Sequence, residues 1–218
     1  MPDVVKRIRQ DDRKIEARWP SAVAVIAAGW LNMGLPAAYS AGPHWLLLVL
    51  VLILLPPAIL THRYGRHDLN RICGYLLSGV ITAFLAWSVI MLVLRLPGHQ
   101  EPPAVLLRSA GALWITNVLV FACWYWRLDA GGPHARDVSE KHVNGAFLFP
   151  QMTRPDEENP GWSPEFLDYL FLAFNTSTAF SPTDTAILSR WAKILVMTQS
   201  IISLTVLALL AARAVNIL

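Results

Sequence analysis

The sequence predicts an all-α integral membrane protein with five transmembrane helices and one re-entrant half-helix before the last span. Of its 218 residues, 55% are hydrophobic and only 15% are charged, and the mean hydropathy is +0.43. A soluble domain of this length carries more charge, so much of the apolar surface must face lipid. Several apolar stretches reach the roughly 20 residues that a helix needs to cross the bilayer core.

Residues 1–19 are expected to form a charged cytoplasmic N-terminal segment and not a secretory signal. They hold six Lys/Arg and four Asp/Glu, and no apolar run leads to a small-residue cleavage site. Val4, Val5, Ile8 and Ile15 alternate with basic residues in a pattern that suits a short helix lying at the lipid headgroups. A solvated charged tail is the alternative.

Four predicted spans precede a long polar loop. They cover residues 20–39, 45–60, 72–94 and 105–126. In the second, Pro56 and Pro57 are expected to kink or end the helix. The first three spans make up a transmembrane region at 20–104. The rest, 105–218, is predicted to be a pore-like module with an outer helix 105–126, a long loop 128–162, a re-entrant half-helix 164–184 and an inner helix 188–218. Within the loop, residues 147–150 are apolar enough to dock against the bundle.

The half-helix has a recognisable start at Ser163-Pro164-Glu165. Ser can cap a helix, Pro suits the first helical position, and an acid in the first turn complements the helix dipole. The apolar stretch that follows, 166–174, is too short to cross a bilayer and runs into a polar stretch, 175–184. Half-helix, extended segment and long helix is the layout of a pore loop.

Residues 164–218 resemble the pore region of tetrameric potassium channels. Aligned without a gap, Thr-Ala-Phe-Ser-Pro-Thr-Asp at 178–184 falls on their Thr-Thr-Val-Gly-Tyr-Gly-Asp, and Trp-Ala-Lys at 191–193 falls on their Trp-Gly-Arg. The phrase at 179–184, with the ending at 211–218, also resembles a family of uncharacterised bacterial membrane proteins, some of them labelled ion-channel-like. These resemblances imply a multi-pass protein of the bacterial inner membrane that assembles as a homotetramer around an ion pathway.

The expected function is a weakly selective cation pore that lacks a glycine-based potassium filter. Both filter glycines are absent, so the backbone cannot point successive carbonyls at an ion, and Pro182 fixes its own φ. Four copies of Asp184 would form an acidic ring. The predicted pore-lining residues are Ser177, Thr178, Ala179, Phe180, Ser181, Pro182, Thr183 and Asp184. On the inner helix, Gln199 and Ser203 are predicted to form interhelical hydrogen bonds, with pore lining as the alternative.

A non-conducting reading stays open. Residues 175–178 could be a helix C-terminus held by side-chain hydrogen bonds, with Asp184 capping the last helix. The protein would then be an interaction or assembly subunit.

We expect no enzyme and no cofactor, because the sequence has no nucleophile elbow, phosphate-binding glycine loop or paired-His helix. We expect no nucleic-acid partner either, because the basic residues behind the net charge of +3 lie beside apolar spans. His134, Asp137, Glu140 and His142 match no strong metal motif, so no metal is expected either.

The distribution of Lys and Arg predicts the orientation. Six lie in the N-terminal segment, three near residue 65 and six between 127 and 193, whereas only Arg95, Arg108 and Arg213 fall on the other side. The positive-inside rule then places the N-terminus and the long loop in the cytoplasm. A pore loop would therefore enter from the cytoplasmic side, inverted relative to potassium channels, as in ionotropic glutamate receptors.

Overall fold

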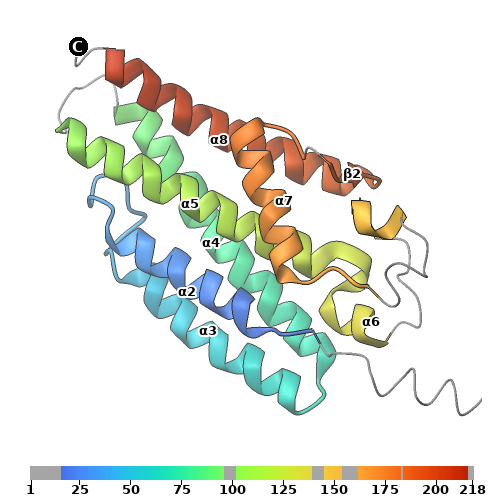
Figure 1. The fold of residues 1–218 in the computed structure, drawn as a ribbon. Helices are drawn as coiled ribbons and strands as arrows, with labels where there is room; N and C mark the ends of the chain where they lie inside the picture. The colour runs from blue at the N-terminus through green and yellow to red at the C-terminus, as the bar shows by residue number, and fades with distance from the viewer. Residues whose placement is uncertain (1–15, 96–101, 139–144, 154–161, 183, 216–218) are drawn as a thin grey trace, which may run out of the picture.

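The computed structural model describes residues 16–95, 102–138, 145–153, 162–182 and 184–215. These residues are mostly helical, which confirms the predicted all-α class. Five longer helices lie alongside one another, and a shorter one, α7, packs across α5 and α8 (Figure 1). The helices of the bundle are α2 Trp19–Met33, α3 Leu46–Arg63, α4 His67–Arg95, α5 Pro103–Leu128, α7 Phe166–Ala179 and α8 Arg190–Val215.

Three of the described helices, α4, α5 and α8, are long and apolar enough to cross a membrane. Their positions match the third, fourth and last predicted spans. The apolar part of α3 is shorter, Leu46–Thr61, and α2 has 15 residues. A membrane protein with at least these long apolar helices is therefore what the structure supports, and the count of five spans stays a prediction.

The outside of the bundle is apolar, as a lipid-facing surface must be. The core is centred on α5, where Phe121 is 1% exposed. Large apolar side chains also cover the outer faces of the other helices. Examples are Val23 and Trp30 on α2, Leu52 and Ile53 on α3, Ile72 and Ile90 on α4, and Ile194 and Ile201 on α8. A soluble monomer rarely exposes contiguous apolar surface on this scale, so lipid or another protein must cover it.

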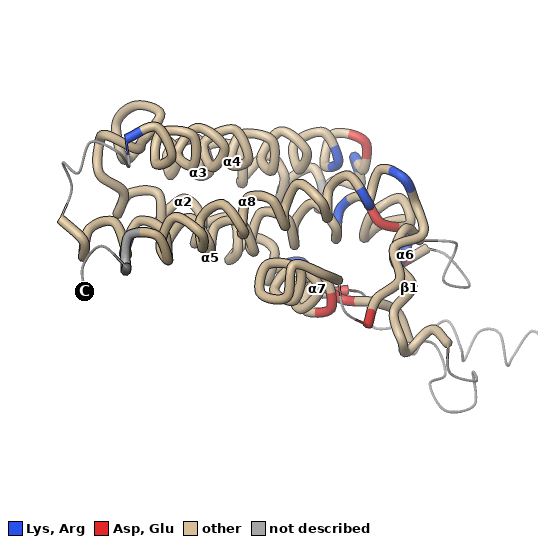
Figure 2. The backbone as a smooth tube through the Cα atoms, turned by 90° about the horizontal axis from the view of Figure 1, so that it is seen from above, with Lys and Arg blue, Asp and Glu red and all other residues tan. Residues whose placement is uncertain are grey.

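Among the described residues, most of the charged ones gather at one end of the bundle, where α6 (Pro133–Val138) and β1 (Phe147–Leu148) lie (Figure 2). The start of α4, the end of α5 and the start of α8 meet there because successive helices run in opposite directions. Arg95 and Arg108 lie at the opposite end, on either side of the α4–α5 connection. We call the two ends the charged end and the apolar end.

The described part of the long loop folds back onto the charged end. After α5 come η2 (Asp129–Gly131) and α6, then β1 and η3 (Pro150–Thr153). The turn into α6 needs glycine at Gly132, where φ is +93° and a Cβ would lie 2.9 Å from the carbonyl oxygen of Arg127. Phe147 and Phe149 are 1% and 4% exposed, so the predicted docking of 147–150 on the bundle is confirmed.

The proline pair in the second predicted span does not end it. Pro56 and Pro57 lie inside α3, which continues to Arg63. Each proline removes one intrahelical hydrogen bond, but its fixed φ is close to the helical value, so the chain can continue in a helix.

Candidate functional site

The helix α7 extends from the charged end to about the middle of the bundle. Near its start, the hydroxyl of Tyr169 donates to Oδ2 of Asp129 at 2.6 Å, just beyond the end of α5. Near its end, Ser177 faces Asn117, whose Nδ2 lies 3.5 Å from the Ser177 hydroxyl. Twelve residues of α5 and its extension separate these two contacts, or about 18 Å along a helix axis. The contacts of α7 therefore cover a little more than half of a length equal to the thickness of a bilayer core, which is about 30 Å.

The start of α7 is held by a reciprocal cap. Glu165 is the N-cap residue, its carboxylate accepts the backbone N–H of Asp168, and the carboxylate of Asp168 accepts the Glu165 N–H at 2.8 Å. The prediction that Ser163 caps this helix is wrong. The pair of acids three residues apart satisfies two free backbone groups at once, and one serine upstream would satisfy only one.

Beyond α7 the chain turns and returns to the charged end. Phe180 ends the helix in the left-handed conformation with φ 54°. A few residues later, β2 (Ala186–Ile187) pairs antiparallel with β1, which belongs to the charged end. Residues 166–187 therefore enter the bundle and leave it on the same side, as Figure 1 shows.

The predicted pore residues fall into two groups. Thr178, Ala179, Phe180, Ser181 and Asp184 are exposed on the outside of the single chain, and Pro182 is half-buried. Ser177, Gln199 and Ser203 are fully buried between helices. Thr183 lies outside the described residues.

The non-conducting alternative predicts side-chain hydrogen bonds at the end of α7 and a cap by Asp184 at the start of α8, and the structure shows the first but not the second. The hydroxyl of Thr178 does bond back to the carbonyls of Phe174 and Asn175, at 2.9 and 3.2 Å, as a helix C-terminus would. Asp184 does not cap the last helix, because Ser189 occupies that role, with its hydroxyl 3.3 Å from the backbone N of Ala192.

A buried polar network joins α7 to α5 and α8. Gln199 of α8 is at its centre: its Nε2 donates to the carbonyl oxygen of Ala173 at 2.7 Å and to the Ser177 hydroxyl at 2.8 Å. Its Oε1 accepts from the hydroxyl of Tyr125 at 2.6 Å. From α5, Asn117 donates to the Gln199 carbonyl oxygen at 3.1 Å and to the Ser203 hydroxyl at 3.0 Å. The predicted interhelical hydrogen bonds of Gln199 and Ser203 are thus present, within one chain.

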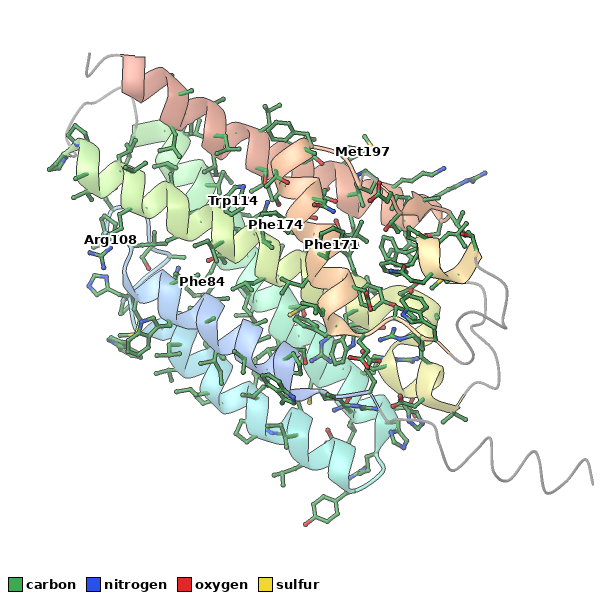
Figure 3. All side chains as sticks on the ribbon, in the orientation of Figure 1. Phe84, Arg108, Trp114, Phe171, Phe174 and Met197 are labelled. Atoms are coloured by element: carbon green, nitrogen blue, oxygen red, sulfur yellow. The ribbon has the colours of Figure 1, made fainter. Side chains whose placement is uncertain are left out.

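An aromatic contact supports this network. The rings of Trp114 on α5 and Phe174 on α7 meet edge to face with centroids 5.8 Å apart (Figure 3). Trp114 also donates its indole N–H to the Ser177 carbonyl oxygen at 3.4 Å. The last turn of α7 is therefore fixed in both position and rotation.

A second buried cluster, at the charged end, was not predicted. The guanidinium of Arg136 donates to Oε2 of Glu16 at 2.9 Å and to the carbonyl oxygens of Trp126 and Asp129, each at 2.9 Å. It also lies over the ring of Tyr169, 5.1 Å from the centroid. Glu16 in addition accepts from the indole N–H of Trp126. We call these five residues the ionic cluster.

The ionic cluster connects four parts of the chain that are distant in sequence. Asp129, which is fully buried, accepts from the backbone N of Ala146 just before β1 and from Tyr169 of α7. Next to it, Arg18 pairs with Asp137 at 2.9 Å. Sequence reasoning placed Glu16 in a charged tail and Arg136 in a solvated loop, because no local pattern reveals their pairing.

Four residues of the long loop, His134, Asp137, Glu140 and His142, lie close together in the sequence and were considered as metal ligands. Of the four residues considered, Glu140 and His142 lie outside the described residues. His134 stacks on His67 with ring centroids 3.4 Å apart. No group of three metal-ligating side chains occurs among the residues that the structure describes.

Burial raises the pKa of Glu16 above its ordinary value of 4.5, although Arg136 and the Trp126 hydrogen bond pull it down. The folded state therefore binds this proton more tightly than the unfolded state. Its contribution to stability is fully present below pH 4.5 and is lost as the pH rises through the raised value. We predict that Glu16→Gln removes this pH-dependent loss. The difference in unfolding temperature between variant and wild type should therefore shift in favour of the variant as the pH rises from 4.5 to 8. Unfolding midpoints measured in detergent across that range test this, and a temperature difference that does not change with pH would contradict it.

No family model, curated protein or solved structure matches the chain. The resemblance of residues 164–218 to channel pore regions stays a prediction from sequence.

Proposed function

We propose that the protein is the subunit of a weakly selective small-cation pore in a bacterial inner membrane, with five spans and α7 as a re-entrant half-helix. One observation carries the proposal: residues 166–187 enter and leave the bundle at the charged end, and α7 stops about halfway along α5. An irregular backbone at such a depth is tolerated in a membrane where protein or water covers it.

The end of α7 favours cations. A helix carries about half a negative charge at its C-terminus, and here that end lies near mid-depth beside the exposed Thr178 and Ser181. Asp184 adds a full negative charge on the return path. Hydroxyl oxygens can replace part of an ion's hydration, but without glycines the backbone cannot form successive carbonyl rings. Selectivity between potassium and sodium should therefore be weak.

One copy cannot enclose a pore, and the outer faces of α7 and α8 supply a surface for assembly. Only 22% of the apolar window of α8 is buried, against 50% for α5. Exposed apolar side chains form one stripe on each helix. The stripes are Leu167, Phe171 and Phe174 on α7, and Ile194, Met197, Ile201 and Leu204 on α8. Several copies around an axis would cover both stripes, and the potassium-channel resemblance implies four.

This arrangement assigns different roles to the two groups of predicted site residues. The exposed group, from Thr178 to Asp184, would face the axis. Ser177 and Gln199 would hold α7 in place from behind, and Ser203 would tie α8 to α5, because all three are already hydrogen-bonded inside the subunit. The concentration of Lys and Arg at the charged end favours a cytoplasmic location for that end, and hence for the N-terminus.

Ion flux into liposomes that hold the purified protein tests the proposal. Sodium and potassium fluxes should be similar, and each should exceed that of empty liposomes. Asp184→Asn should lower both fluxes severalfold while leaving the oligomer intact, because the negative charge near the pathway is lost. Asp68→Asn is the matched control, since Asp68 is also exposed at the charged end but belongs to α4.

The outcomes separate the parts of the proposal. A well-folded oligomer that passes no ion under voltage or pH gradients rules out a pore and supports a non-conducting assembly subunit. The wholly apolar stripe on α8 is also what such a subunit would use to bind its partners. Flux that is unchanged in Asp184→Asn rules out only the acidic ring.

A further inference from the structure

Arg127, in the last turn of α5, packs its guanidinium against the backbone of α4. A Cβ added at Gly74 would lie 1.8 Å from Nη1 and 2.3 Å from Cζ of Arg127. The guanidinium also lies over the ring of Trp126, 5.2 Å from the centroid. Only a glycine at position 74 leaves room for the arginine in this place.

This cation has no anionic partner in the described part of the chain. Its Nε is buried without a hydrogen-bond acceptor. The titratable groups that face it are Cys123 on its own helix, Cys73 and Tyr75 on α4, and Arg18, which precedes α2. None of these is a carboxylate, and Arg18 is itself bound to Asp137. A half-buried arginine in such surroundings attracts an anion from outside the chain.

The position of Arg127 indicates which anion. It ends the run Trp124-Tyr125-Trp126-Arg127, at the charged end of an apolar helix, where lipid headgroups lie if α5 spans the membrane. Arg71 precedes Gly74 by three residues, lies on the same face of α4 and is exposed. A guanidinium binds phosphate through two parallel hydrogen bonds, and basic recesses between helices on the cytoplasmic side hold anionic headgroups.

We infer that Arg127, seated on Gly74, binds the phosphate of an anionic phospholipid at the α4–α5 junction, with Arg71 at the outer edge of the site. The inference rests on the membrane embedding in the proposed function but not on the pore. A protein that conducts no ions could still bind the lipid, and flux could persist without it.

Native mass spectrometry of the purified full-length protein, in micelles that contain phosphatidylglycerol and phosphatidylcholine, tests this inference. Wild type should retain phosphatidylglycerol in preference. Arg127→Gln should lower that retention about tenfold, as expected for a lost charge-assisted pair of hydrogen bonds. Gly74→Ala should do the same, because the new methyl group occupies the place of the guanidinium.

Two controls match these variants. Gly79→Ala adds a methyl group to the same helix where nothing lies within 4 Å, and Arg108→Gln removes a charge at the apolar end. Both should retain the lipid as wild type does. Equal retention in Arg127→Gln and wild type overturns the site. Displacement of phosphatidylglycerol by equimolar inorganic phosphate overturns the lipid as its source, because a lipid held also by its acyl chains resists such competition.

Discussion

Replacing Gln199 by leucine should destabilise the protein by about 2–4 kcal/mol, since several buried groups lose their partner at once. The Tyr125 hydroxyl would have no acceptor, and the Ser177 hydroxyl and the Ala173 carbonyl oxygen would lose their donor. For a chain of this length, such a loss lowers the unfolding midpoint by roughly 5–15 °C. Circular dichroism of the helical signal in mild detergent measures it.

The neighbouring residue provides the control for this prediction. Thr198 is exposed, and its hydroxyl only bonds back to the Ile194 carbonyl oxygen. Thr198→Ala should therefore stay within about 0.5 kcal/mol of wild type. Tyr125→Phe, which removes one donor and leaves Oε1 of Gln199 unpaired, should fall between the two. If Gln199→Leu and Thr198→Ala were equally stable, the network would not be what holds α7 on α8.

The long helices could be predicted from sequence because their signal is local. An apolar run of sufficient length determines where α4, α5 and α8 lie to within a few residues, whatever they pack against. The half-helix could be expected for the same reason, as an apolar run too short to span. How far this helix reaches along α5 could not be predicted, because it depends on contacts between Ser177 and residues of two other helices.

The buried polar groups were harder to assign than the apolar ones. Tyr125 lies between Trp124 and Trp126, in a run whose composition is typical of a membrane interface, yet it is fully buried. Its spacing from Asn117 is two helical turns plus one residue, which places both on one face of α5. This spacing was the available signal, and it indicates a polar face only once the partner Gln199 is known.

Charge pairs over long sequence separation leave no pattern in the sequence. Glu16 and Arg136 are 120 residues apart, and each occurs in a stretch whose composition is typical of solvated chain. The positive-inside count treats every Lys and Arg as a surface charge. The described Lys and Arg do lie mostly at the charged end (Figure 2), but the count could not predict that Arg136 is buried there.

Arg136→Met should be the most destabilising substitution at the charged end, at about 3–5 kcal/mol near neutral pH. The methionine fills a similar volume but leaves the Glu16 carboxylate buried without its cation, and the carbonyl oxygens of Trp126 and Asp129 without their donor. Because the ionic cluster also contacts Tyr169, the start of α7 should loosen as well. Thermal unfolding measures the first effect, and faster backbone hydrogen exchange at residues 166–170 measures the second.

The physical cause of that loss can be tested by rescue. If the unpaired carboxylate is responsible, Glu16→Gln in the Arg136→Met background should restore part of the stability. Lowering the pH should do so as well, because burial raises the pKa of Glu16 and a lower pH protonates it. The nearby pair of Arg18 and Asp137 is the control, because its side chains are 17% and 18% exposed. Arg18→Gln should cost about 1 kcal/mol or less, as a partly solvated ion pair does. Failure of both rescues would mean that Arg136 acts through the two carbonyl oxygens and the Tyr169 ring and not through Glu16.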